Sequence, residues 1–366
     1  MSRPIFIIYS NLGLGGMPVR ITDIVNKIGS THPNTGVYIV LKEQRDFDLR
    51  AIITNPNVHI LDFYRWCPFD SSVLFMLWAW YHIFQKNPTT ILGFISPYAL
   101  TILASRMLFF WRDTRILINE GHYTSTILQT MALPWLQSMG IRLLYPNADS
   151  IIVPTKAIQD NLINEYRIPS EKIVVISNWS RYALGKLPTN LRPFDLIYAG
   201  RLEDTKQILP LLQLCRDIIC SSRPSLTLLL VGEGSQKDAC LRFIQEHKLE
   251  RNIFVLAPII NISTLMRRAK LYICNSIGSA EGFPVAMLDA LSLGTLVITK
   301  RFEGVDEVLD EKSGYIVTTD AEMREKIEYS LSRLSTLRSK IARAKRIAKT
   351  YHSIHNIYKY LQLFYV

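Results

Sequence analysis

Residues 195–232 decide the fold. DLIYAG at 195–200 is followed by a helical pattern over Leu209–Ile219 and then by LTLLLVG at 226–232. Two apolar runs joined by a helix are typical of a βαβ unit in a parallel sheet. The same alternation continues toward the C-terminus, with further strand-like runs at 253–258 (IFVLAP), 271–276 (LYICNS) and 295–300 (TLVITK).

The N-terminal half repeats this alternation. Its strand-like runs are IFIIYS at 5–10, Val37–Leu41, Val58–Ile60, Thr90–Ile95, Arg115–Ile118 and Ser150–Val153. After Asn178 the chain becomes polar and contains Gly185, Pro188 and Pro193, as a linker does. We therefore predict an α/β protein of two doubly wound domains, with ligands at the carboxyl ends of the strands. The predicted parts are an N-terminal domain (1–180), a linker (181–193), a C-terminal domain (194–335) and a basic helix (336–366) that crosses back to the N-terminal domain.

Composition narrows the class of protein. The chain has 366 residues, of which 48% are hydrophobic and 20% charged, so it is not a disordered chain. Its five cysteines lack CxxC spacing, which disfavours a disulfide framework or a zinc site and favours a reducing compartment. The charge-free stretches Ser71–Gln85, Asn87–Ser105 and Gly121–Ile141 are interrupted or short for a membrane span. Their aromatic side chains, such as Trp78, Phe84 and Trp135, still allow contact with a membrane surface.

The net charge of +11 is concentrated near the C-terminus, where residues 329–366 hold eight Lys and Arg and no acid. Leu334, Leu337, Ile341, Ala344 and Ala348 share one helical face there, which predicts a basic amphipathic helix. Because the excess charge lies on one helix and no zinc, RRM-like or helix-turn-helix pattern is found, we expect no nucleic-acid partner. An anionic membrane surface or a lipid-linked glycan is the better anionic partner.

In each predicted domain, the loop after the first strand is a candidate anion-binding site. Gly13-Leu14-Gly15-Gly16 lies between a strand and a helix, where glycines let the backbone approach a ligand and the helix start offers N–H groups. A tight structural turn explains this loop nearly as well. In AGRLEDTK (199–206), Arg201 and Lys206 suit a diphosphate, although surface cations beside Glu203 and Asp204 are the alternative.

The most specific segment is SAEGFPVAMLDAL at 279–291. Pro284 favours the first turn of a helix, and Asp289 then lies inside that helix. Glu281 and Asp289 are at most about 12 Å apart along a helix, which exceeds the separation of a glycoside hydrolase carboxylate pair. The spacing suits the two ends of an extended ligand, with the helix start between them holding phosphate.

This segment resembles the E-x7-E element of retaining GT-B glycosyltransferases of family 4. Four further elements in the same order are similar to that family: GLGG with its helix, YPNAD…VISN (145–178), AGRLEDTK with LLLVGEGSQ (228–236), and FEGVDEVLDEKSGYIV (302–317). The resemblance implies two Rossmann-like domains facing a central cleft, with the acceptor on the N-terminal and the donor on the C-terminal side. It also implies transfer of a hexose or N-acetylhexosamine from a UDP- or GDP-sugar, with retention and without a metal or other cofactor.

The resemblance assigns roles by position. Glu281 contacts the donor sugar, Arg201 and Lys206 contact the diphosphate, and Asp289 contacts the ribose. The other predicted donor-binding residues are Gly15, Gly16, Gly282, Phe283, Pro284 and Val285.

Two positions depart from the family pattern. Asp289 stands where the family has glutamate, which shortens the side chain by one methylene. The run Asn119-Glu120-Gly121-His122 displaces the family histidine by one residue, so Glu120 and His122 are both catalytic candidates, with a structural histidine as the alternative. The segment Leu128–Met139 is predicted to be core, with contact to lipid as the alternative.

We therefore expect a glycosyltransferase that acts at the cytoplasmic face of a membrane on a lipid-linked or polysaccharide acceptor, in cell-surface glycan synthesis. The departures at Asp289 and His122 support one alternative from another class. In that alternative the chain is a catalytically lapsed subunit that binds another glycosyltransferase.

Overall fold

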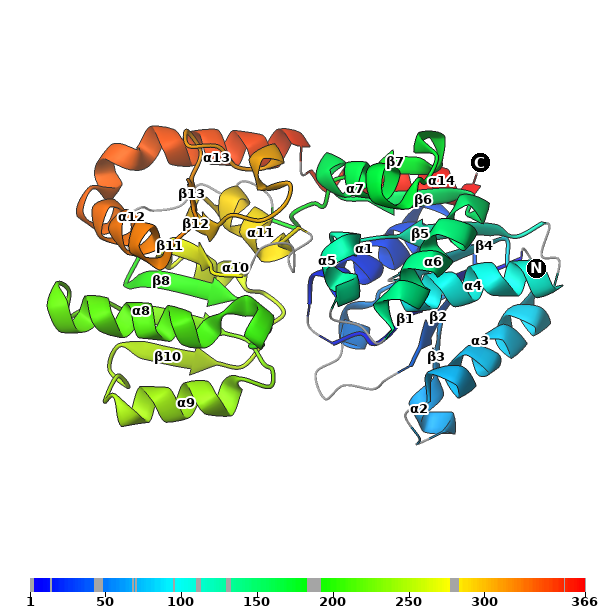
Figure 1. The fold of residues 1–366 in the computed structure, drawn as a ribbon, viewed down its shortest axis with the longest axis horizontal. Coiled ribbons are helices and arrows are strands. Elements are labelled where there is room, and N and C mark those ends of the chain that lie inside the picture. Colours follow the sequence, from blue (N-terminus) through cyan, green and yellow to red (C-terminus); the bar gives the residue numbers. More distant parts are fainter. Residues whose placement is uncertain are drawn as a thin grey trace. The chain divides into compact units, whose positions relative to one another are not determined.

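The computed structural model describes residues 3–13, 15–42, 49–67, 69, 71–94, 96–109, 113–129, 133–182, 192–276, 283–351 and 353–365. The chain forms two compact units (Figure 1). Unit 1 comprises Met1–Ser177 and His355–Val366, and unit 2 comprises Asn178–Ile354.

Unit 1 is built on a parallel sheet of seven strands in the order β3-β2-β1-β4-β5-β6-β7. The apolar runs of the sequence form these strands, because both faces of a parallel sheet are covered. The strands are β1 (Ile5–Tyr9), β2 (Val37–Leu41), β3 (Val58–Asp62), β4 (Thr90–Phe94), β5 (Arg115–Asn119), β6 (Ser150–Val153) and β7 (Ile173–Val175).

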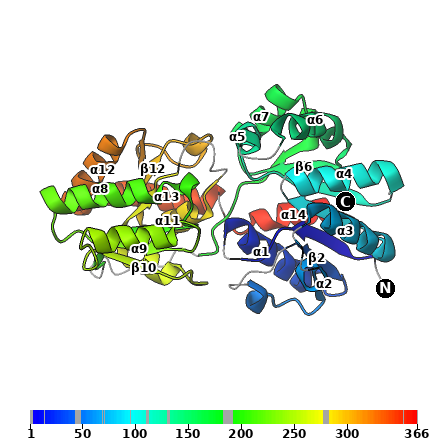
Figure 2. The ribbon, with the colours of Figure 1, turned by 60° about the horizontal axis from the view of Figure 1, so that its bottom comes forward.

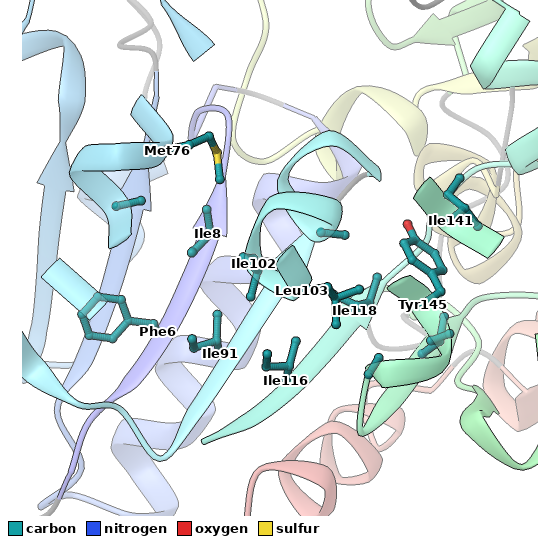
Figure 3. Close-up of a cluster of buried hydrophobic side chains, with 14 of the residues drawn as sticks. Phe6, Ile8, Met76, Ile91, Ile102, Leu103, Ile116, Ile118, Ile141 and Tyr145 are labelled. Atoms are coloured by element: carbon teal, nitrogen blue, oxygen red, sulfur yellow. The ribbon is translucent and has the colours of Figure 1, made fainter. Parts of the chain in front are cut away.

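Helices cover this sheet and bury its side chains. On one face, Ile8, Ile91 and Ile118 from the strands pack with Leu103 of α4 and Tyr145 (Figure 3). The α-helices of unit 1 are α1 (Gly16–Thr31), α2 (Phe63–Trp66), α3 (Ser72–Lys86), α4 (Ser96–Phe109), α5 (Thr124–Gln129), α6 (Pro134–Leu144), α7 (Lys156–Tyr166) and α14 (Asn356–Tyr365); its 3-10 helices are η1 (Leu49–Ile52), η2 (Tyr145–Asn147) and η3 (Ser170–Lys172).

Unit 2 has a parallel sheet of six strands in the order β10-β9-β8-β11-β12-β13, which is a doubly wound order. The strands are β8 (Phe194–Ala199), β9 (Leu228–Val231), β10 (Ile253–Leu256), β11 (Ala269–Cys274), β12 (Leu296–Lys300) and β13 (Tyr315–Val317). The helices are α8 (Ile208–Ser221), α9 (Lys237–Glu246), α10 (Ser263–Met266), α11 (Val285–Leu293), α12 (Asp320–Ser332) and α13 (Arg338–Tyr351), with 3-10 helices η4 (Asp204–Lys206), η6 (Val305–Glu307) and η7 (Leu334–Leu337).

The predicted fold class of two doubly wound α/β domains is confirmed. The C-terminal tail differs from the single helix that we expected, because it forms η7 and two α-helices. α13 packs on α11 in unit 2, where Ala344 and Ala348 are buried. α14 packs on α1 in unit 1 (Figure 2), since Ile357, Leu361 and Phe364 form a second buried face. Within the described residues, no helix is both long and apolar enough to cross a bilayer.

Candidate functional site

In unit 2, the loops that sequence analysis singled out follow neighbouring strands of the sheet. β8 and β11 are neighbours in the sheet, and the strand order reverses between them. At such a switch point the loops after the two strands diverge and leave room for a ligand. The AGRLEDTK loop follows β8, and the loop that leads to α11 follows β11.

Glycines fix the backbone at this edge. A Cβ atom added at Gly232, just after β9, would overlap the carbonyl oxygen of Gly200. One added at Gly234 would overlap the backbone of Leu202. The Leu202 N–H donates to the Glu233 carbonyl at 2.9 Å, and the Gln236 N–H donates to the Leu202 carbonyl at 2.9 Å. The loops after β8 and β9 are therefore locked to one another by backbone contact.

The two cations of the loop after β8 have different environments. Arg201 is exposed and forms an ion pair with Glu203 at 2.7 Å. Lys206 closes η4 and is buried. An exposed pair of this kind contributes at most about 1 kcal/mol, so Glu203 can release Arg201 to a phosphate at low cost. The surface-cation alternative fits Arg201 but does not fit the buried Lys206.

The start of α11 lies on the same edge. Pro284 is the N-cap of the helix and Val285 its first residue. The first N–H groups of a helix have no intrahelical acceptor and favour an anion. Asn178 holds this turn in place, because its side-chain amide donates to the Phe283 carbonyl at 3.1 Å.

Asp289 is buried inside α11. Its Oδ1 accepts a hydrogen bond of 2.7 Å from the Ser180 hydroxyl, and the same hydroxyl oxygen accepts from the N–H of Tyr182 at 3.1 Å. Burial and the Asp289 carboxylate raise the pKa of Tyr182 to about 12. In this structure the Asp289 carboxylate is therefore hydrogen-bonded to Ser180. Glu281 and Gly282 lie outside the described residues.

In unit 1, two predicted segments meet. Gly15 is the N-cap of α1, and Gly16 is its first residue. A Cβ atom at Gly15 would meet only Pro18 at an ordinary contact distance, so packing does not require a glycine there. A Cβ atom at Gly121 would touch the Met17 side chain, which places the turn that holds His122 against the start of α1. His122 itself is half-buried.

Glu120 lies deeper than we expected. Its side chain is completely buried beyond the end of β5, and one carboxyl oxygen accepts a hydrogen bond of 2.8 Å from the Tyr145 hydroxyl. The other oxygen has no hydrogen-bond partner among the residues that the structure describes. Burial raises the pKa of Glu120 from 4.5 to about 7, against the opposing effect of the Tyr145 bond. Glu120 therefore lies in the interior of unit 1 and not at its surface, where we expected a residue that contacts a substrate.

Sequence reasoning missed three polar residues that shape these edges. Asn178 is the last residue before the polar stretch, and in the structure its amide holds the Phe283 carbonyl. Ser180 bonds Asp289 from a segment assigned to the end of the N-terminal domain. Asn275 is buried after β11 and its amide donates to the Gln207 carbonyl at 2.8 Å, next to Lys206. The available signal was a polar residue near the end of an apolar run: Asn275 directly follows β11, and Asn178 comes three residues after β7. Ser180 had no such signal.

The segment Leu128–Met139 is not uniformly core. Leu128 is buried, but Trp135, Leu136 and Met139 on α6 are exposed. Within the part of the chain that the structure describes, no three His, Cys, Asp or Glu side chains form a group that could hold a metal ion.

Comparisons with known proteins identify the family and the fold of the chain. The family model for glycosyl transferases group 1 matches residues 184–348, and the model for glycosyltransferase family 4 matches residues 36–179. A Campylobacter jejuni N-acetylgalactosamine-N,N'-diacetylbacillosaminyl-diphospho-undecaprenol 4-alpha-N-acetylgalactosaminyltransferase is 26% identical over 60% of this chain and 60% of its own. A Staphylococcus aureus poly(ribitol-phosphate) alpha-N-acetylglucosaminyltransferase is 24% identical over 46% of this chain.

The chain spans only 60% and 34% of the lengths of these two relatives. Among solved structures, Anabaena HepE in complex with UDP and glucose is similar over 98% of both chains, with a TM-score of 0.77 and 15% identity. That similarity concerns the fold of both units. Because the two family models together cover both units, the chain belongs to the group 1 and family 4 glycosyltransferases, and it has their GT-B fold.

Proposed function

We propose that this chain transfers a hexose or N-acetylhexosamine from a UDP- or GDP-sugar to a lipid-linked or polysaccharide acceptor in cell-surface glycan synthesis. Unit 2 binds the donor. Family membership and the names of the relatives support this proposal, since one is named for a diphospho-undecaprenol acceptor and another for a poly(ribitol-phosphate) acceptor.

One observation carries the proposal. Arg201, the buried Lys206 and the start of α11 share the strand edge at which β8 and β11 diverge. Two cations and a helix N-terminus form a site for a diphosphate, and hydrogen bonds to charged groups contribute about 1.5–3 kcal/mol each. Asp289 then binds the ribose hydroxyls in place of Ser180.

In the proposed reaction, the bond between the sugar C1 and the diphosphate oxygen breaks, and the acceptor oxygen bonds to C1 on the same face. The diphosphate oxygen accepts the acceptor proton, and the configuration at C1 is retained. Arg201, Lys206 and the α11 N–H groups stabilise the charge on the leaving diphosphate, so the reaction requires no metal. Glu281 with Gly282 orients the donor sugar.

Unit 1 supplies the acceptor side of the proposal. Gly15 and Gly16 at the start of α1 allow close approach of a ligand, and His122 lies on a turn that touches the same helix. Glu120 accepts a hydrogen bond from the Tyr145 hydroxyl and immediately precedes this turn, and in the proposal it holds the turn in position. The proposed location is peripheral, at the cytoplasmic face of a membrane.

Removing the cations tests the donor site. We expect Arg201→Ala and Lys206→Ala each to reduce transfer at least about tenfold, which corresponds to about 1.4 kcal/mol of transition-state stabilisation. Lys206→Met keeps an unbranched apolar chain in the buried position and removes the ammonium group with its charge and its N–H donors. Arg242→Ala, on the exposed side of α9, is the matched control. Unchanged kinetics in the Arg201 and Lys206 variants would refute the diphosphate site.

A second experiment separates an enzyme from a lapsed subunit. Thermal-shift measurements with a panel of UDP- and GDP-sugars identify the donor, because a ligand raises the apparent stability by mass action. Donor hydrolysis or transfer by the wild type that is lost in Glu281→Ala supports catalysis. Donor binding with no turnover against a panel of lipid-linked and oligosaccharide acceptors supports the subunit.

A further inference from the structure

Unit 1 exposes large apolar side chains on two consecutive segments. α3 lies along the outside of the unit, and α2 precedes it in the chain (Figure 1). Six side chains, each 53–72% exposed, form what we call the α2–α3 patch: Trp66, Phe69, Val73, Leu77, Tyr81 and Phe84. On α3 their spacing of four, four and three residues puts the last four on one helical face.

The opposite face of α3 is also apolar. Phe75, Met76, Ala79 and Ile83 are buried in the core of unit 1. α3 is therefore apolar both on the face that packs in the core and on the face that is exposed. A helix that is apolar all round is covered by protein or by lipid.

Ring packing holds the patch in shape. The Trp66 ring stacks on Trp78 of α3, with centroids 6.4 Å apart, and the Phe63 ring meets Trp78 edge-on at 5.6 Å. Trp66 thus stays exposed although its ring is fixed by α3. Rigid tryptophan, tyrosine and phenylalanine side chains at a surface suit the interfacial zone of a bilayer.

The charges around the patch favour an anionic bilayer. The sequence contains no Asp or Glu from Ser71 to Arg112, so α3 and α4 carry no acidic side chain. Exposed cations lie at both ends of the patch, namely Arg65 on α2 and Lys86 at the end of α3. Arg65 is 3.7 Å from the Asp62 carboxylate, which also pairs with Arg50 at 2.8 Å, so these three side chains together carry one positive charge. His82, within α3, has its pKa lowered by burial and by Lys86, which favours the neutral imidazole.

α6 also exposes apolar side chains. It contacts α4, which in turn contacts α3. Trp135, Met139 and Leu143 are exposed on one face of α6, and the sequence from Gly121 to Ala148 contains no acid. The helices α3, α4 and α6 therefore carry no acidic side chain, and α3 and α6 expose apolar ones.

We propose that the α2–α3 patch inserts into the interfacial zone of a bilayer that contains anionic phospholipid. α3 has 15 residues and is about 22 Å long, which is too short to span a bilayer and suits a helix lying in its plane. This inference rests on the proposed function to the extent that a lipid-linked acceptor requires a membrane-bound enzyme. The proposal differs from membrane binding through the basic tail. Two cations of that tail already have partners within unit 2, since Arg343 pairs with Asp310 at 2.6 Å and Lys340 donates to the Gly314 carbonyl at 3.1 Å.

Vesicle flotation of the full chain tests the proposal, with vesicles of phosphatidylcholine alone and of phosphatidylcholine with phosphatidylglycerol. The variant Leu77→Glu with Phe84→Glu places two charges in the patch. We expect it to lower the bound-to-free ratio at least about tenfold, because charged side chains enter lipid unfavourably. The matched control is Leu241→Glu with Ile260→Glu, at exposed apolar positions of unit 2. Circular dichroism and the UDP-induced thermal shift check that each variant is folded and binds nucleotide.

Each outcome decides the question. Loss of flotation in the patch variant alone, with most wild-type binding kept in high salt, supports insertion, since salt screens charge but not apolar burial. Equal flotation of all variants, absence of wild-type flotation from both vesicles, or loss of binding in high salt overturns the proposal. A wild-type dimer that the patch variant converts to a monomer assigns the patch to a second copy of the chain and also overturns it. None of these results depends on nucleotide binding, so a failure of the donor site is seen separately.

Discussion

Replacing Glu120 by glutamine tests whether unit 1 contains a neutral buried carboxyl group. Burial raises the pKa of Glu120 from its ordinary 4.5 to about 7. In the folded chain the proton is therefore kept to a higher pH than in the unfolded chain. A carboxyl group of this kind adds stability below about pH 4.5, and that contribution is lost as the pH rises to about 7.

The magnitude follows from the two pKa values. Each pKa unit corresponds to about 1.4 kcal/mol, so the free energy of unfolding loses about 3 kcal/mol between about pH 4.5 and 7 through this group. Glutamine has nearly the same shape and its oxygen can still accept the bond from Tyr145. Because glutamine does not titrate, the substitution changes the free energy of unfolding by the same amount at every pH through this side chain. The difference between wild type and Glu120→Gln should therefore shift by about 3 kcal/mol in favour of the variant over this range.

Urea unfolding followed by tryptophan fluorescence measures this difference at several pH values. Five of the six tryptophans (Trp66, Trp78, Trp80, Trp111 and Trp135) belong to unit 1, so the signal reports mainly on that unit. Glu171→Gln, an exposed position on η3, serves as the surface control. A pH-independent difference between wild type and Glu120→Gln would refute the neutral carboxyl group.

Three further predictions concern unit 2. We expect Gly232→Ala to destabilise the unit by more than about 1 kcal/mol, because the new Cβ overlaps the Gly200 carbonyl; urea unfolding measures this, and wild-type stability would contradict the locked loops. Ser180→Ala should lower the melting temperature without weakening nucleotide binding, because the ribose replaces a bond that Ser180 makes only in the free protein, whereas Asp289→Ala should weaken binding; isothermal titration with UDP separates the two, and weaker binding in Ser180→Ala would contradict the exchange. Transfer should persist in EDTA, since the proposed mechanism neutralises the diphosphate with Arg201, Lys206 and α11; loss of transfer that Mg²⁺ restores would contradict it.

The fold and the strand edge that carries Arg201, Lys206 and the start of α11 could be predicted because local sequence determines them. The apolar runs that form β8 and β9 are followed by Gly200 and Gly232, and position 232 requires glycine because a Cβ atom there would overlap the Gly200 carbonyl oxygen. Pro284 marks the start of α11 in the same direct way. Short motifs therefore located these elements without any knowledge of tertiary contacts.

The environment of individual side chains could not be predicted in this way. Glu120 follows an apolar strand and looked accessible, but Tyr145, 25 residues away, draws it into the core. The segment that forms α3 is apolar throughout, so no period in the sequence distinguishes its buried face from its exposed face. The division of the tail into α13 and α14 depends on each helix packing on a different unit.

These differences indicate where specificity resides. In the proposed donor site, unit 2 contacts the diphosphate with the start of α11 and two cations, a chemistry that suits any nucleoside diphosphate. Unit 1 combines the His122 turn with an acid-free helical layer that is exposed and apolar on α3 and α6. If the α2–α3 patch enters a bilayer, membrane contact and acceptor binding belong to the same unit, and substitutions that change the acceptor should map to unit 1 without altering nucleotide affinity.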